Sequence, residues 1–335
     1  MPLYALEDLD DALAVTRGFL TPIDRTVWAK LALVAFFIGG PGANFSSFQS
    51  TTGGGNGGPP PGEVFFPDFG VPIWTLIAAL VAVVLLVVLV FALVGSIMEF
   101  VFVESLRAEE VAIRRYWSRR WRQGVRLFGF RLLVGFFVFG SAALLGVFGF
   151  LYLDTVDPGA LVALGLLVLP VFLVLALVVG LVNGFTTVFV VPIMILSDGG
   201  VLDGWRRLWP TITEQPSQYL AYAVASFFLS ILGGLLVAIT VAVLALLLLV
   251  PFGVLFALGI ALLVFVSEPV GIGALVLVGV LFGLSVLVVA ALVQVPVQAY
   301  LRYYALLVLG DVDPELDLVP DQRAAVRESS PESTA

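Results

Sequence analysis

The side chains that could do chemistry are few, because the chain of 335 residues contains no histidine and no cysteine. Histidine is the commonest general base and metal ligand, and cysteine supplies thiolate nucleophiles and disulfides. Only carboxylates remain for acid–base catalysis, and they are scarce inside the long apolar segments. We therefore expect no enzymatic activity, no metal site and no tightly bound cofactor.

Two carboxamides, Asn183 and Gln294, are almost the only strongly polar side chains within those apolar segments. A polar residue inside a membrane is a candidate for function by default, because burying it in lipid is costly. The pair could line a polar pathway, or each could hydrogen-bond between packed helices for about 0.6–2 kcal/mol. We favour the second interpretation, since an ion-coupled carrier usually places a carboxylate near the midplane and none is there.

A second candidate region is the basic stretch 104–131. Its apolar side chains, among them Trp117 and Trp121, recur every three, four or seven residues and so share one helical face. Another face carries four arginines: Arg115, Arg119, Arg122 and Arg126. Such a helix is suited to an anionic leaflet, where each arginine contributes about 1 kcal/mol of attraction. Alternatively, the stretch is basic only because it fixes the topology.

The shorter segment 201–212 repeats this pattern, with Trp205 and Trp209 in its apolar stripe. Two such helices on one side of a membrane predict a cytoplasmic collar. We expect the collar to engage anionic lipid headgroups, and a protein partner is also compatible with it. We expect no nucleic-acid partner.

Composition indicates which fold must position these residues. Hydrophobic residues make up 61% of the chain and charged residues 12%, against about 45–50% and about 25% in soluble domains. The mean hydropathy is +1.12. The sequence therefore predicts an all-α integral membrane protein with amphipathic interfacial helices. Acidic residues occupy the N-terminus, where a signal peptide would need a basic region.

Six apolar runs are candidate spans, and the run at 219–266 is long enough to cross a membrane either once or twice. A single crossing gives six spans, with both termini and all sixteen Lys and Arg residues cytoplasmic. Two crossings would move the last three arginines outside. The positive-inside rule favours six spans, and we expect them in the cell membrane. The runs are 31–45, 72–103, 132–153, 160–196, 219–266 and 270–309.

The spans imply a division of the chain into three regions. Residues 1–30 form a cytoplasmic amphipathic segment, 31–310 the polytopic membrane domain, and 311–335 an acidic, disordered cytoplasmic tail. Within the membrane domain we expect three connecting loops: an external Gly/Pro-rich loop at 41–71, a basic cytoplasmic loop at 104–131, and a cytoplasmic loop at 197–218. The triplet Asn44-Phe45-Ser46 is a glycosylation sequon, and a chance match this close to the bilayer is the favoured interpretation.

The chain also repeats itself at an offset of 88 residues, which places Trp117 and Trp121 on Trp205 and Trp209. Two runs end alike, in Val191-Pro192-Ile193 and Val295-Pro296-Val297. These matches predict three helical hairpins derived from one duplicated unit. Internal repeats are frequent in transporters, although duplication also occurs in proteins that transport nothing.

Several segments resemble known membrane proteins: Tyr4–Ala12, Leu31–Gly40, Val295-Pro296 and Arg302-Tyr303-Tyr304. The chain resembles the polytopic membrane-domain family associated with some glycerophosphodiester phosphodiesterases, and uncharacterised membrane proteins of haloarchaea. The catalytic barrel of the phosphodiesterase and its histidines are absent. The resemblance therefore implies a fold of six spans, and it does not imply an activity.

These observations lead to one functional expectation and one alternative. We expect a non-catalytic membrane module whose basic amphipathic helices engage anionic lipids or a partner protein. The alternative is a small-solute transporter or channel built from the repeated hairpins.

Overall fold

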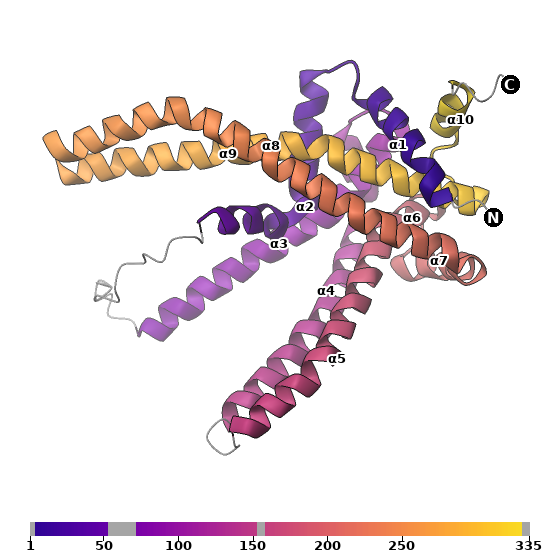
Figure 1. The fold of residues 1–335 in the computed structure, drawn as a ribbon, viewed down its shortest axis with the longest axis horizontal. Coiled ribbons are helices and arrows are strands. Elements are labelled where there is room, and N and C mark those ends of the chain that lie inside the picture. Colours follow the sequence, from indigo (N-terminus) through magenta and orange to yellow (C-terminus); the bar gives the residue numbers. More distant parts are fainter. Residues whose placement is uncertain (1–3, 53–71, 153–157, 330–335) are drawn as a thin grey trace.

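The structure, a computed structural model, describes residues 4–52, 72–152 and 158–329. These residues are almost entirely helical, and no strand occurs among them. Three long helical hairpins project from a common junction (Figure 1). Helices α1 (Tyr4–Leu20), α7 (Val201–Glu214) and α10 (Pro320–Ser329) lie at that junction.

The hairpins pair α2 (Arg25–Thr52) with α3 (Ile73–Ala108), α4 (Ile113–Tyr152) with α5 (Pro158–Phe185), and α8 (Pro216–Phe265) with α9 (Glu268–Val312). Helix α5 continues through a π-helical turn, Thr186–Val190, into α6 (Val191–Ser197). A short 3-10 turn, Pro314–Leu316, connects α9 to α10.

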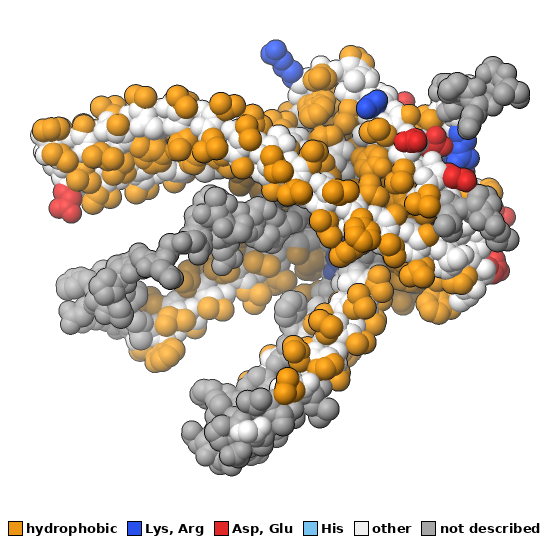
Figure 2. Space-filling model, in the orientation of Figure 1, with side chains coloured by type: hydrophobic (Ala, Val, Ile, Leu, Met, Phe, Trp, Pro, Cys, Tyr) orange, Lys and Arg blue, Asp and Glu red, His pale blue; other side chains and the backbone are white. Residues whose placement is uncertain are grey.

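The outer parts of the hairpins expose apolar side chains, as Figure 2 shows for the α8–α9 arm. Four helical segments are long and apolar enough to cross a membrane: Trp74–Ala108, Val168–Ser197, Pro216–Phe265 and Glu268–Val312. A helix that is apolar around its whole circumference needs either a protein core or lipid as its surroundings. Among the described residues these four segments are largely uncovered, and such exposed apolar helices are those of a membrane protein.

Helix α9 consists of an exposed part in the arm and a buried part in the junction. Residues 268–290 are exposed or half-exposed apart from Gly271, and at 1.5 Å per residue they extend about 34 Å. That length matches a hydrocarbon core of about 30 Å. The following part of α9 is buried in the junction, where Tyr303 donates to the carbonyl of Leu106 at 2.9 Å and Tyr304 to that of Ala5 at 2.6 Å. One helix thus serves both the arm and the junction.

Helix α8 runs without a break from Pro216 to Phe265, and Pro251 lies inside it. The apolar segment that was long enough for two crossings is therefore one continuous helix. A single helix can cross a bilayer only once, which agrees with the preferred interpretation of this segment.

Two expectations about the connecting segments are wrong. The stretch 104–131 is not a loop, because α3 ends at Ala108 and α4 begins at Ile113 and continues into the arm. Residues 41–52 belong to α2, and only 53–71 remain outside the described residues. The connection expected at 197–218 contains α7, which agrees with the helix predicted at 201–212.

The expectation of a disordered tail is also wrong for residues up to Ser329. Leu316, Leu318 and Val319 are buried in the junction, and α10 follows them. The acidic composition suggested disorder, but two of the acids, Asp311 and Asp317, are paired with arginines that the tail itself supplies. Those ion pairs are part of the candidate site.

Candidate functional site

A buried ion pair joins Glu99 of α3 to Arg302 of α9, with side chains only 3% and 6% exposed. Arg131 of α4 reaches the same carboxylate at 3.4 Å and donates to the hydroxyl of Thr187 at 2.6 Å. Glu99, Arg131 and Arg302 come from three different hairpins. The network therefore ties all three hairpins together at the point where they converge.

The π-helical turn explains how Arg302 finds a second partner. The N–H of Val191 bonds to the carbonyl of Thr186, five residues back. In the same register the next N–H would bond to Thr187, but residue 192 is proline and has no N–H. The carbonyl of Thr187 is left for the guanidinium of Arg302, which donates to it.

A second buried network surrounds Arg120, whose side chain is 4% exposed. Its guanidinium contacts Glu104 of α3 at 2.6 Å and also pairs with Asp198, which follows α6. Gln123, one turn further along α4, donates to the carbonyl of Met194 at 2.8 Å. Charge-assisted contacts of this kind fix geometry as well as adding energy. They hold α4 between α3 and α6.

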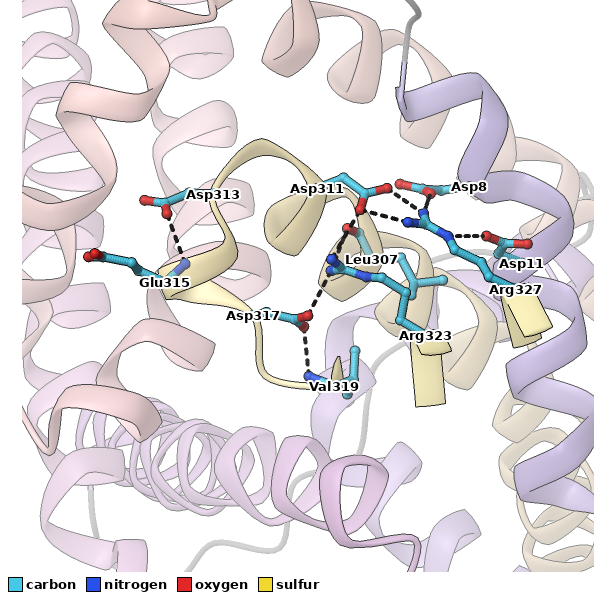
Figure 3. Close-up of polar contacts among 10 residues, drawn as sticks. All are labelled: Asp8, Asp11, Leu307, Asp311, Asp313, Glu315, Asp317, Val319, Arg323 and Arg327. Carbon is cyan, nitrogen blue, oxygen red and sulfur yellow. Dashed lines mark hydrogen bonds and ion pairs between the residues drawn. The ribbon is translucent and has the colours of Figure 1, made fainter. Parts of the chain in front are cut away.

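A third network lies outside the arms, where α10 packs against α1 and the end of α9 (Figure 3). Arg327 contacts Asp311 at 2.5 Å, and Asp8 and Asp11 of α1 at 3.2 Å each. Arg323 contacts Asp311 at 3.0 Å and Asp317 at 3.2 Å. The carboxylates therefore all face arginines, and we interpret the cluster as a strap that fastens the two ends of the chain together.

Gly310 makes room for this strap. A Cβ atom at that position would lie 1.7 Å from the Nη2 atom of Arg323. Arg323 also donates to the carbonyl of Leu307 at 3.2 Å, so its guanidinium must pass directly over the α9 backbone. Only glycine permits that approach.

Asp8 is the least favourably placed acid of the strap, because its side chain is fully buried. Burial raises the pKa of Asp8 to about 8, and repulsion from Asp311 and Asp11 adds to this shift. Arg327 opposes the shift but does not cancel it. Since the pKa of Asp8 lies near neutrality, the strap contains a proton-binding group.

The predicted lipid-facing residues of α4 remain largely available to solvent. Arg115, Arg119, Arg122 and Arg126 are exposed. Trp121, 47% exposed, lies beside Arg122, whose guanidinium carbon is 5.7 Å from the indole ring centroid. Trp117 is half-buried against the junction core.

The two tryptophans of α7 also differ in exposure, as those of α4 do. Trp209 is 60% exposed. Trp205 is half-buried, and its indole N–H donates to the hydroxyl of Thr186 at 3.0 Å. Trp205 therefore secures α7 to the π-helical turn, and Trp209 is the tryptophan of α7 that faces outward.

Helix α4 also borders a shallow pocket of about 600 Å³ at the end where it meets α2. Lys30 of α2 reaches across and donates to the carbonyl of Val111 at 3.2 Å. The other lining residues belong to the start of α4: Ala112, Ile113, Arg114, Arg115 and Ser118. This is a cationic pocket at a helix N-terminus.

Asn183 and Gln294 do not behave as expected. Both are half-buried, and their side-chain oxygens have no hydrogen-bond partner among the described residues. The predicted hydrogen bonds between helices are thus not formed through these oxygens. Asn183 lies one turn before Thr187 and Gln294 about two turns before Arg302, so both border the Glu99–Arg302 network on its arm side.

The sequence analysis missed Arg120, because it considered only Arg115, Arg119, Arg122 and Arg126 as candidate binding residues of this stretch. The buried face of α4 is formed instead by Tyr116, Arg120, Gln123 and Leu127. Their helical spacing matches that of the predicted apolar stripe, and the signal was hidden because two of the four are polar. For Glu99 the signal was visible, since it is the one carboxylate in the run at 72–103.

Comparison with known proteins identifies a family. A family of unknown function, DUF7544, matches residues 3–319. No curated protein and no solved structure matches the chain. The family agrees with the expectation of an uncharacterised group, and it gives no link to the phosphodiesterase-associated proteins or to a haloarchaeal family.

We predict that Arg302→Met lowers the free energy of unfolding by about 3–5 kcal/mol, because it leaves Glu99 buried without its main counterion. The double variant Glu99→Gln/Arg302→Met should recover part of that loss, since the unpaired carboxylate is gone. Arg126→Met, an exposed change on the same junction, should cost less than about 0.5 kcal/mol. Chemical unfolding in detergent measures all three. A double variant as unstable as Arg302→Met alone, or less stable, would contradict the ion-pair explanation.

We predict a pH dependence of stability that comes from Asp8. Its folded pKa of about 8 exceeds the ordinary value of 3.8, so folding takes up a proton that the unfolded chain releases. The stabilisation is complete below about pH 4, declines as the pH rises toward 8, and is lost above that value. Unfolding midpoints from about pH 5 to 9 should therefore fall in the wild type and stay flatter in Asp8→Asn. The exposed Asp24→Asn control should keep the wild-type slope, and an unchanged slope in Asp8→Asn would refute the assignment.

Proposed function

Because the chain belongs to DUF7544, a family of unknown function, we propose a role from its own structure. The protein is a non-catalytic module of the cell membrane whose junction holds anionic lipid headgroups at the cytoplasmic surface. The observation that carries this proposal is the exposed face of α4, where arginines and Trp121 lie directly before the apolar arm.

The order of residues along α4 supports a position at the membrane–water boundary. The exposed arginines end at Arg126, the network arginine Arg131 follows, and the exposed apolar residues Leu132 and Leu133 begin the arm. Tryptophan is enriched where the hydrocarbon core meets the headgroups, and basic residues there attract anionic lipid. Arg206, Arg207 and Trp209 of α7 add a second group of the same kind.

The distribution of charge supports six crossings with the junction inside the cell. The basic side chains gather at the junction (Figure 2), and among the described residues of the arms beyond it Glu268 is the charged one. Basic residues favour the cytoplasmic side. Both termini lie at the junction (Figure 1), so both are cytoplasmic in this proposal.

Two features support the proposed duplication of the hairpin unit. Helix α4 begins at Ile113 and α7 at Val201, 88 residues later, which is the offset found in the sequence. A residue with a left-handed backbone precedes each start by three or four residues, Glu109 with φ 51° and Asp198 with φ 50°. The two basic helices of the junction are then copies of one element.

We predict that Arg119→Gln/Arg122→Gln/Arg126→Gln reduces the affinity of the protein for phosphatidylglycerol by up to about 100-fold, at about 1 kcal/mol per arginine. Lipids retained with protein extracted from vesicles of mixed phosphatidylglycerol and phosphatidylcholine give the measurement. The matched control, lysine at the same three positions, keeps the charge and should keep the enrichment. Unchanged enrichment in the glutamine variant would refute the proposal and favour a partner protein as the ligand of this face.

The second candidate function is a solute pathway, favoured by the unpartnered oxygens of Asn183 and Gln294. Buried polar atoms normally have partners, and water or a polar solute would supply them. The chain has no native cysteine, so Asn183→Cys and Gln294→Cys can each be labelled with a maleimide. A closed lipid-binding module predicts no labelling, whereas labelling at either position would favour the pathway. Gly57→Cys and Ser329→Cys test the topology, with labelling expected from outside only at Gly57→Cys.

A further inference from the structure

The carboxyl groups of Asp8 and Asp311 approach each other inside the strap, one from α1 and the other from α9 (Figure 3). Both contact the same atom, Nη2 of Arg327, Asp8 at 3.2 Å and Asp311 at 2.5 Å. One guanidinium carries a single positive charge, so it cannot neutralise two carboxylates at once. Like charges held this close disfavour the doubly ionised state and favour the uptake of a proton by one of the pair.

The contacts of the two carboxyl groups indicate which of them holds that proton. Asp311 accepts from Arg327 and also contacts Arg323 at 3.0 Å. The Oδ2 atom of Asp8 is buried and has no hydrogen-bond partner among the described residues. Buried polar atoms normally have partners, and a proton on Oδ2 turns this orphan acceptor into a donor toward Asp311. Asp8 is therefore the better place for the proton.

The charge balance of the strap points to the same proton. Among the described residues, the acids of the strap outnumber its arginines: Asp8, Asp11, Asp311 and Asp317 against Arg323 and Arg327. Solvent reaches Asp11, whose side chain is 20% exposed, but it does not reach Asp8. Burial is the main cause that raises the pKa of Asp8 to about 8, followed by repulsion from Asp311 and a hydrogen bond with it.

The remaining titratable groups around Asp8 are phenols. Helices α8, α9 and α10 pack against α1. The groups that they and α1 itself present are Tyr222 of α8, Tyr300, Tyr304 and Asp311 of α9, Arg323 and Arg327 of α10, and Asp11 of α1. Tyrosine is neutral below about pH 10. Acids and arginines thus set the charge around Asp8, whereas Tyr300 and Tyr304 hold α1 on α9 by donating to the carbonyls of Leu9 and Ala5.

We propose that a proton on Asp8, donated to Asp311, closes the strap, and that loss of this proton as the pH rises releases α10 from α1. Without the proton the two carboxylates repel each other, and the departure of α10 lets water reach Asp8. Helix α1 stays on α9, because the bonds from Tyr300 and Tyr304 go to its backbone. The strap is then a pH-sensitive fastening of the two chain ends, independent of lipid binding.

The two pKa values of Asp8 give the sign and the size of the effect. The pKa is about 8 in the closed strap against an ordinary value of 3.8, so opening releases a proton. Between these values the equilibrium constant for opening rises about tenfold for each pH unit, and above about pH 8 it levels off. From about pH 6 to about pH 8 opening therefore increases about 100-fold.

The test is hydrogen–deuterium exchange of the purified full chain across this pH range. Hydroxide itself accelerates exchange, so each rate is divided by that of the same amide in Asp8→Asn at the same pH. Asparagine has the shape of the protonated acid and keeps a donor toward Asp311, so the strap of this variant stays closed. We expect the ratio to rise about 100-fold between about pH 6 and pH 8 in α10, and to stay constant in α1.

The matched control is Asp11→Asn, which also removes an acid of α1 that contacts Arg327. It should keep the rise in α10, because Asp8 is unchanged. A constant ratio in α10 of the wild type overturns the proposal, even if the unfolding midpoint falls with pH. A rise that disappears in Asp11→Asn overturns it as well.

Infrared difference spectra of the wild type test the proton itself and need no variant of Asp8. We expect the carbonyl stretch of a protonated carboxyl group at about pH 6, where ordinary aspartates are ionised. The band should disappear as the pH rises past about 8, and it should remain in the spectrum of Asp11→Asn at about pH 6. A wild-type spectrum without this band at about pH 6 refutes the shared proton.

Discussion

The buried contact between Glu99 and Arg302 is the interaction on which the rest of this structure depends. A carboxylate and a guanidinium taken out of water stabilise a protein only when their geometry is good and their remaining hydrogen-bonding groups are satisfied. Here Arg131 and the carbonyl of Thr187 complete the set. Apolar arms attract one another only weakly in lipid, because lipid tails are as apolar as the side chains. Polar contacts at the junction therefore determine how the three hairpins converge.

The separation between apolar arms and a polar junction explains the unusual length of the helices. An arm needs about 20 apolar residues to cross a bilayer, yet α4, α8 and α9 contain 40, 50 and 45 residues. For α4 and α9 the additional length lies in the junction, where these helices bury polar and aromatic side chains against α1, α3 and α6. A helix that continues from lipid into a polar assembly transmits its orientation without a hinge. The basic face of α4 is consequently fixed relative to the arm that follows it.

Much of this architecture was predictable from the sequence, because hydrophobicity and charge act locally. The helical class, the apolar segments and the helical character of 113–131 and 201–212 follow from periodicity and composition. The burial of Arg120 and Arg302 did not, since a charged residue is buried only when a distant partner is available, and neither Glu104 nor Glu99 is adjacent in sequence. The ordered tail was hidden for the same reason. Its acids appear unpaired in the sequence until α1, α9 and α10 are brought together.

The strap at the ends of the chain also has a consequence for the order of biosynthesis. Asp8 leaves the ribosome well before Arg327, which pairs with it and follows 319 residues later. Every hairpin must therefore be inserted before the first helix can acquire its counterion. A chain interrupted anywhere before α10 would lack the arginine that contacts Asp8 and Asp11, and also the helix that packs against α1. The first helix of the incomplete protein would therefore be held less firmly than that of the complete one.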